Sequence, residues 1–133
     1  MPDPTSFPVL EQSSGSYFGT LKDDFGELIP LVDLVTLTLT LYVIKRDGNS
    51  TIINGRDHQN ALLVNNVTVF NTLQTLADGR TYNLRWNYQP ADTTLVEALP
   101  VERHIALFEW STAQVQAGKH EMVLAVENLI QVG

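Results

Sequence analysis

The histidines and the acids next to them are the residues of this chain best suited to bind a metal. Glu102 and His104 lie two residues apart, and His120 precedes Glu121 on what reads as the adjacent strand of a hairpin; His58 stands apart. Imidazole nitrogens and carboxylate oxygens that converge from neighbouring strands can hold a divalent ion. The alternative is that each histidine begins a strand, with its ring half exposed at the rim of a sheet. We favour that alternative and expect no metal site.

Glu109 is the acid with the most unusual setting, because it lies within the apolar run ALFEW. A glycosidase needs two such acids flanking a cleft. An acid in a sheet more often pairs with a base on a neighbouring strand, here Arg85, Arg103 or Lys119. No nucleophile-elbow, zinc-protease, phosphate-loop or dinucleotide-binding motif occurs. We therefore expect no enzyme, no catalytic residues and no cofactor.

Three aromatic residues have the right side chains for a sugar-stacking platform. Trp86 and Tyr88 alternate with polar residues on one strand, and Trp110 follows Phe108 on another. Flat rings stack on pyranose faces when they are exposed side by side. In a pair of packed sheets, however, such residues usually fill the space between the sheets. We assign all three to the core.

The overall composition excludes several classes of partner and site. The chain of 133 residues has no cysteine, which excludes disulfides and thiolate sites, and it has a net charge of −7 with eight scattered Lys and Arg. Nucleic-acid binding needs clustered basic residues, which this chain lacks. Binding to an acidic membrane surface is disfavoured for the same reason. The N-terminal MPDPTSFPVLEQSSGS has neither a basic nor an apolar signal region, so we expect a soluble protein made in a cytoplasm.

The strands that must position these residues are clearest at 34–44, LVTLTLTLYVI. Side chains alternate between the two faces of a strand. Val35, Leu37, Leu39, Leu41 and Val43 are therefore expected on a core face, with the threonines on a half-wet opposite face.

Further strand patterns follow at intervals of about ten residues. Asp47-Gly48 and the ADGR at 77–80 read as hairpin turns. RHIALFEWS at 103–111 is apolar on both faces, which predicts a central strand covered on both sides. Residues 56–66 fit either a short helical turn or a crossover loop, and 91–102 fit a linker or one helical turn begun at Asp92. The pattern predicts an all-β chain forming a single antiparallel β-sandwich of immunoglobulin-like or jelly-roll type at residues 17–133.

Residues 1–16 differ in composition from the rest, with three prolines and four serines. Proline fixes φ and lacks an N–H donor, so this segment is expected to be an extended N-terminal arm. Its apolar FPVL piece is unusual for a disordered tail. A frayed terminus is the alternative.

Several quoted segments together resemble a group of small bacteriophage structural proteins. They are TLTLTLYVI with TIINGRDHQN, then LRWNYQPADTTLV, and then ERHIALFEWS with AGKHEMVLAVENL, all within residues 34–132. More loosely, the chain is similar to the immunoglobulin-like N-terminal domain of phage baseplate proteins. Two loops depart from the pattern: FNTLQTLADGRTY is longer than the usual tight turn, and STAQVQA replaces a glycine-rich loop. The resemblance implies a virion structural protein without enzymatic activity.

Within that class the expected role is a head decoration, or cement, protein on the capsid exterior. Its expected partners are the major capsid protein, other virion proteins and further copies of itself, for example in a trimer. An arm that orders on binding adds contact area, and many symmetric copies add strength. The alternatives are a neck, tail or baseplate adaptor, and a carbohydrate-binding module on a tail tip. The residues expected to anchor the partner are Phe7, Val9, Leu10, Tyr17 and Phe18.

Overall fold

The computed structural model describes residues 6–23, 25–97, 100–113 and 117–128, which contain strands and two short 3₁₀ turns. The 3₁₀ turns are η1 (Leu31–Asp33) and η2 (Pro90–Thr93). Neither has the length or apolar character of a membrane-spanning helix, and no other helix occurs in the described residues. The strands in chain order are β1 (Ser6–Leu10), β2 (Gly15–Gly19), β3 (Leu34–Ile44), β4 (Ser50–Ile52), β5 (Gln59–Asn60), β6 (Val67–Thr75), β7 (Thr81–Tyr88), β8 (Val101–Thr112) and β9 (Ala117–Glu127).

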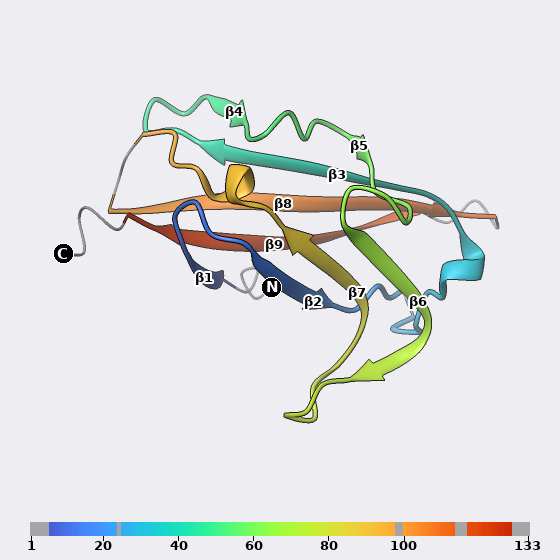
Figure 1. Ribbon diagram of the computed structural model, residues 1–133. Coiled ribbons are helices and arrows are strands. Elements are labelled where there is room, and N and C mark those ends of the chain that lie inside the picture. Colours follow the sequence, from blue (N-terminus) through green and yellow to red (C-terminus); the bar gives the residue numbers. More distant parts are fainter. Residues whose placement is uncertain (1–5, 24, 98–99, 114–116, 129–133) are drawn as a thin grey trace.

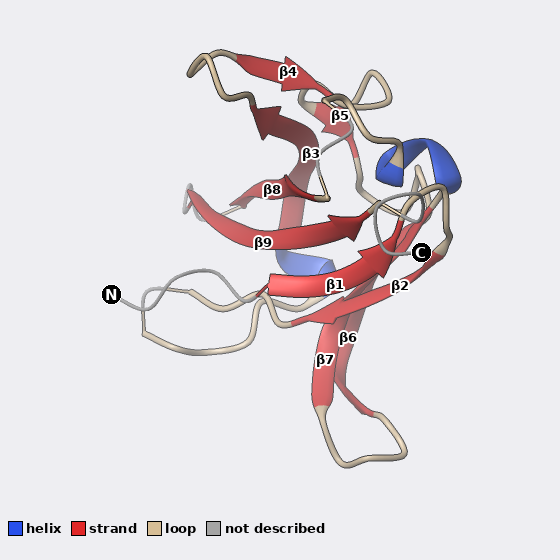
Figure 2. Ribbon diagram, turned by 90° about the vertical axis from the view of Figure 1, so that its left-hand side faces the viewer, coloured by secondary structure: helices blue, strands red, loops and turns tan. Residues whose placement is uncertain are grey.

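The strands form two sheets that pack face to face (Figures 1 and 2). The larger sheet has the order β1-β9-β8-β3-β4, with β5 also paired to β3, and the smaller has the order β2-β7-β6. All pairs of described strands are antiparallel except β1 and β9, which run parallel. The predicted all-β sandwich is confirmed, and the parallel pair is its one departure from an antiparallel design.

The core lies between the sheets and is built from alternating residues of both. Trp86 of β7 and Phe108 of β8 are its largest fully buried side chains, and their rings meet edge to face at 5.9 Å between centroids. Such a pair adds to the stabilisation that comes from burying the two rings. Gly118 of β9 lies opposite Trp110 in register, and a methyl group there would overlap the indole ring.

The leucine side of β3 faces this core as expected, but Val35 does not. Leu37, Leu39 and Leu41 are fully buried, whereas Val35 is 55% exposed and Leu34 is buried in its place. The pairing with β8 shifts between Leu34 and Thr36, which is a bulge. One extra residue in a strand reverses the alternation on one side of it, so assigning Val35 to the core face was wrong.

The expected N-terminal arm is part of the sandwich over the residues that the structure describes. The backbone at residues 6–10 is extended, as expected, but it forms β1 at the edge of the larger sheet. The edge of a sheet has unpaired backbone N–H and C=O groups, with which an added strand can form hydrogen bonds. An edge strand also tolerates Pro8, which has no N–H to donate. The connection to β2 is also fixed, because Gln12 N donates to Thr93 O and Ser13 N to Thr93 Oγ1. The expected boundary at residue 16 therefore does not separate a free arm from the domain.

The two predicted hairpin turns are confirmed, and one of them ends the most prominent projection of the molecule. Gly48 and Gly79 have φ of +88° and +91°, a left-handed conformation that glycine adopts without strain. The β6–β7 hairpin extends away from the body of the sandwich in both views (Figures 1 and 2). Residues 56–66 form a loop that carries the short β5, and residues 90–93 form the turn η2.

Candidate functional site

Three segments that carry the family resemblance meet in one buried polar network. Asp92 of η2 accepts hydrogen bonds from Arg56 Nε at 2.5 Å and Nη2 at 3.1 Å, and from Asn54 Nδ2 at 3.0 Å. Its second oxygen also accepts the N–H of Gln89 at 2.7 Å. The Arg56 guanidinium carbon lies 5.7 Å from the centre of the Trp86 ring. The carboxylate is thus fully engaged within the chain, and the network fastens η2 to the loop after β4.

His104 and Glu102 extend the same network inside the sandwich. His104 Nε2 lies 2.8 Å from Glu102 Oε1, and Nδ1 lies 3.0 Å from the Asp92 carbonyl oxygen. Burial raises the pKa of Glu102, but the N–H of Val96, the His104 ring and the N–H of Glu97 together hold it below its usual value. Each ring nitrogen of His104 therefore has an oxygen partner inside the sandwich. The expectation that this ring is half exposed at a rim was wrong.

Tyr17 and His120 form a second polar contact, which joins the two sheets. The Tyr17 hydroxyl lies 2.5 Å from His120 Nε2, and the two rings are tilted at 5.8 Å. Burial raises the pKa of Tyr17 to about 12 and lowers the pKa of His120. Tyr17, expected to anchor a partner, is instead engaged between β2 and β9.

The remaining histidine pairs with Glu109, the acid singled out from the sequence. His58 Nε2 lies 3.4 Å from Glu109 Oε1, and its Nδ1 lies 2.7 Å from Asp57 Oδ1. This pair replaces the expected partners of Glu109 on neighbouring strands. Within the described residues, no three side chains of His, Asp or Glu are arranged to hold a metal ion.

The other expected anchors fall in different places. Val9 is only 7% exposed and belongs to the core, so it meets no partner while β1 stays in the sheet. Phe7 lies on β1 opposite Leu124 in register. Leu10 and Phe18 face outward, and they lie on different sheets.

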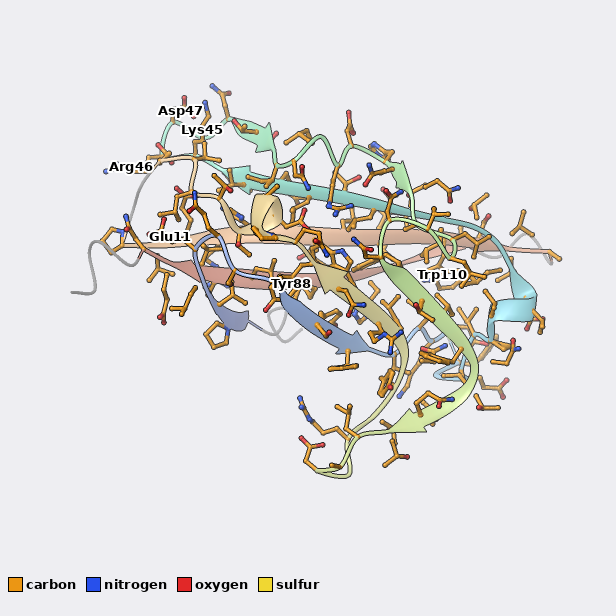
Figure 3. All side chains as sticks on the ribbon, viewed as in Figure 1. Glu11, Lys45, Arg46, Asp47, Tyr88 and Trp110 are labelled. Carbon is orange, nitrogen blue, oxygen red and sulfur yellow. The ribbon has the colours of Figure 1, made fainter. Side chains whose placement is uncertain are left out.

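The three aromatic residues first considered as a sugar platform are in the core, as predicted. Trp86 is fully buried, and Tyr88 and Trp110 are nearly so; Figure 3 shows the latter two lying over different strands. Lys45, Arg46 and Asp47, by contrast, gather at the turn after β3 in the same figure.

A different group of rings lies on the smaller sheet and is partly exposed. Phe18 and Tyr82 have centroids 4.7 Å apart, and Phe70 stands edge-on to Tyr82 at 5.8 Å. The Arg85 guanidinium carbon lies 5.8 Å from the centre of the Phe70 ring. This group was not predicted from the sequence, because Phe70 and Tyr82 lie at the two ends of FNTLQTLADGRTY, which was noted only for being longer than the usual tight turn.

A row of apolar side chains crosses the outer face of the larger sheet, and its members differ in exposure, because Ile52 is 39% exposed whereas Val123 is buried. The register places Ile52, Tyr42, Ile105 and Val123 in one row across β4, β3, β8 and β9. These side chains alternate with the core residues and point to the other side of the sheet. The described chain forms only two sheets, so no third sheet packs on this side. The sequence pattern of β8 predicted cover on both sides of this strand. Within the described residues, its outer side has no covering sheet.

This apolar surface continues toward one end of the strands. Leu10, Ile44 and Val101 are 48%, 58% and 49% exposed. Leu10 and Val101 both lie opposite Glu127 in register, on either side of β9. A groove of about 320 Å³ opens there, where β3 and β8 cease to pair. It is lined by Val43, Ile44, Val101, Glu102, Arg103 and Ile105.

No known family model matches this chain, and no curated protein matches it. Among solved structures, murine CRIg is similar to it at 13% sequence identity, with a TM-score of 0.39. That match covers 93% of this chain and 92% of the CRIg chain.

Proposed function

We propose that the chain is a structural protein of a bacteriophage particle, which adheres to other proteins and carries out no reaction. One observation carries the adhesive role: Val101, Ile105 and Leu107 lie on the outer side of β8, which the second sheet of the sandwich does not cover. Apolar surface is stabilised when it leaves water, at about 25 cal/mol per Å². Large exposed apolar areas on soluble domains mark interaction surfaces. The phage assignment itself rests on the sequence resemblance.

Within the particle, the role we favour is decoration of the capsid exterior, with the major capsid protein or its neighbours as partners. Assembly takes place in the host cytoplasm, and the finished location is the virion. We place the contact surface on the outer face of the larger sheet and not on the N-terminal arm, because Val9 and Tyr17 are engaged within the chain. Of the expected anchors, Leu10 lies on this face. The alternative role is that of an adaptor in the neck, tail or baseplate of the particle.

Counting copies of the protein in purified particles tests this proposal. Decoration predicts hundreds of copies per particle, whereas a neck, tail or baseplate ring predicts about a dozen. The complementary test is Ile105→Glu, which places a charge in the centre of the apolar row and should prevent incorporation. Val32→Glu is the matched control, because Val32 is exposed on η1, outside this face. Absence of the protein from particles would overturn the proposal.

A carbohydrate-binding role is the second candidate, and one observation favours it. Phe18, Tyr82 and Phe70 are partly exposed side by side, with the Arg85 guanidinium over the last ring. Rings in contact give saccharides a stacking surface, and guanidinium donates to their oxygens. A glycan-array screen compares the natural chain with Tyr82→Ala. Binding that disappears in the variant, while the fold persists, would establish this role.

A further inference from the structure

The three strands of the smaller sheet carry one charge, and it is positive. Leu84 and Trp86 of β7 face the core, so the side chain of Arg85 between them points to the outer side of the sheet. The register places Phe18 of β2 and Thr68 of β6 on either side of it. β2, β6 and β7 contain no Asp or Glu, although the whole chain has 15 acidic residues. Arg85 is therefore the only charged residue of these three strands.

Arg85 differs from most other arginines of the chain in having no acidic partner. Arg46, Arg56 and Arg80 each lie within 3.9 Å of a carboxylate. Within the described residues Arg85 forms no ion pair, and its Nε is buried without a hydrogen-bond partner. A buried donor without a partner is uncommon and calls for an explanation. The described chain thus supplies no anion for this cation.

Aromatic rings surround the guanidinium and orient it. Its carbon lies over the Phe70 ring at 5.8 Å, and Phe70 stands edge-on to Tyr82 at 5.8 Å. Tyr82 in turn lies 4.7 Å from Phe18, and all four side chains are partly exposed. The ring face attracts the guanidinium, whose N–H groups stay available to acceptors. Apolar ring surface and an oriented cation therefore lie next to each other on this face.

We propose that this group binds an acidic saccharide, a sugar whose ring carries a carboxylate. The Arg85 guanidinium donates to the carboxylate, because its planar N–H groups match two carboxylate oxygens. The apolar side of the sugar ring packs on Tyr82 and Phe18. This inference rests on the carbohydrate-binding role, the second function proposed above, and names its class of ligand.

Charge favours an acidic sugar over a neutral one. Hydrogen bonds between a guanidinium and a carboxylate are about twice as strong as those between neutral groups, and the anion also neutralises a cation that packs against hydrocarbon.

The polar neighbours of Arg85 favour a sugar over an acidic peptide. Ser16 Oγ donates to Asn87 Oδ1 at 2.6 Å in the next row, and Thr68 lies opposite Arg85 in register. These uncharged side chains suit the hydroxyl groups that surround the carboxylate of a sugar. The side chain of a peptide Asp or Glu has no such hydroxyl groups.

A glycan array tests the inference when each carboxylate-bearing oligosaccharide is printed beside its carboxyl-reduced form, since the two differ only in the charged group. We expect the purified full chain to bind the reduced forms at least about tenfold more weakly. Arg85→Gln should weaken binding of the acidic forms at least about tenfold and leave the reduced forms unchanged.

The matched control is Arg103→Gln, which should leave binding of both forms unchanged. Arg103 also lacks an ion pair within the described residues, but it is exposed on β8 of the other sheet. Far-ultraviolet circular dichroism confirms that each variant is folded.

The possible results separate this inference from the proposed functions. Equal binding of acidic and reduced forms would overturn the acidic ligand and leave the carbohydrate-binding role standing. Binding of acidic forms that Arg85→Gln leaves unchanged would overturn the assignment of the site. If the array binds no chain at all, both this inference and the carbohydrate-binding role are wrong, whereas the structural role is decided separately by the count of copies in particles.

Discussion

The buried pair of Asp92 and Arg56 offers the sharpest test of how the sandwich is held together. Asp92→Asn keeps the shape of the side chain but removes the charge facing a guanidinium that is almost fully buried. Removing one partner of a buried ion pair costs about 3–5 kcal/mol, because the other charge stays buried without compensation. The amide also replaces one of the two acceptor oxygens by an NH₂ group, which then faces a donor, either Asn54 Nδ2 at the Oδ1 position or Gln89 N at the Oδ2 position. We expect a loss in the upper part of that range, which lowers the Tm by roughly 10–20 °C for a chain of this length.

Denaturant unfolding followed by tryptophan fluorescence measures this loss, because Trp86 lies beside the pair. The control is the double variant Arg56→Met with Asp92→Asn, which removes both charges. It should recover at least about 2 kcal/mol of the loss, since two neutral side chains no longer need each other's charge. A single-variant loss below about 1 kcal/mol would refute the reasoning, because it would mean that solvent already compensates the charge.

Three further predictions follow from the same interior. Stability should begin to fall as the pH drops below 6.5, because burial lowers the pKa of His120 and the unfolded chain takes up this proton first. In more acid solution the stabilising contribution of Glu102 should also be lost, because its folded pKa is below its ordinary 4.5. Urea titrations at a series of pH values measure both effects. Stability should also fall between pH 10 and about pH 12, where the unfolded chain loses the Tyr17 proton first. Tyr17→Phe should reduce that alkaline loss in the same titration, and the remainder comes from Tyr88 and Tyr42, whose pKa values burial also raises. Gly118→Ala should cost about 1–3 kcal/mol in thermal unfolding because the added methyl group overlaps the Trp110 ring, and an unchanged Tm would show that the ring moves freely.

The parts of the fold that local patterns dictate could be predicted from the sequence. Alternation over residues 34–44 identified β3, and Asp47-Gly48 identified the turn that follows it. Trp86 was assigned to the core because it alternates with Leu84 and Tyr88, and all three are buried. In each case the information lies within a few neighbouring residues.

The features that were missed depend on segments distant in the chain. The buried setting of His104 comes from η2, whose carbonyl oxygen at Asp92 meets the ring across the sandwich. The parallel pairing of β1 with β9 joins the two ends of the described chain, and no local pattern specifies which edge an N-terminal strand will take. The exposure of Val35 comes from a bulge that is defined only by the pairing with β8.

The pattern of β8 predicted a strand covered on both sides, yet the described residues supply a covering sheet on one side only. Phe108 and Ala106 reach the core, while Ile105 and Leu107 face outward and are only partly buried. Outward leucine and isoleucine side chains gain little stability in an isolated domain, because their exposed area contributes only when it leaves water. Polar residues would serve an isolated sheet equally well and would keep it more soluble. The outward apolar side chains of β8 are therefore best explained by a partner surface.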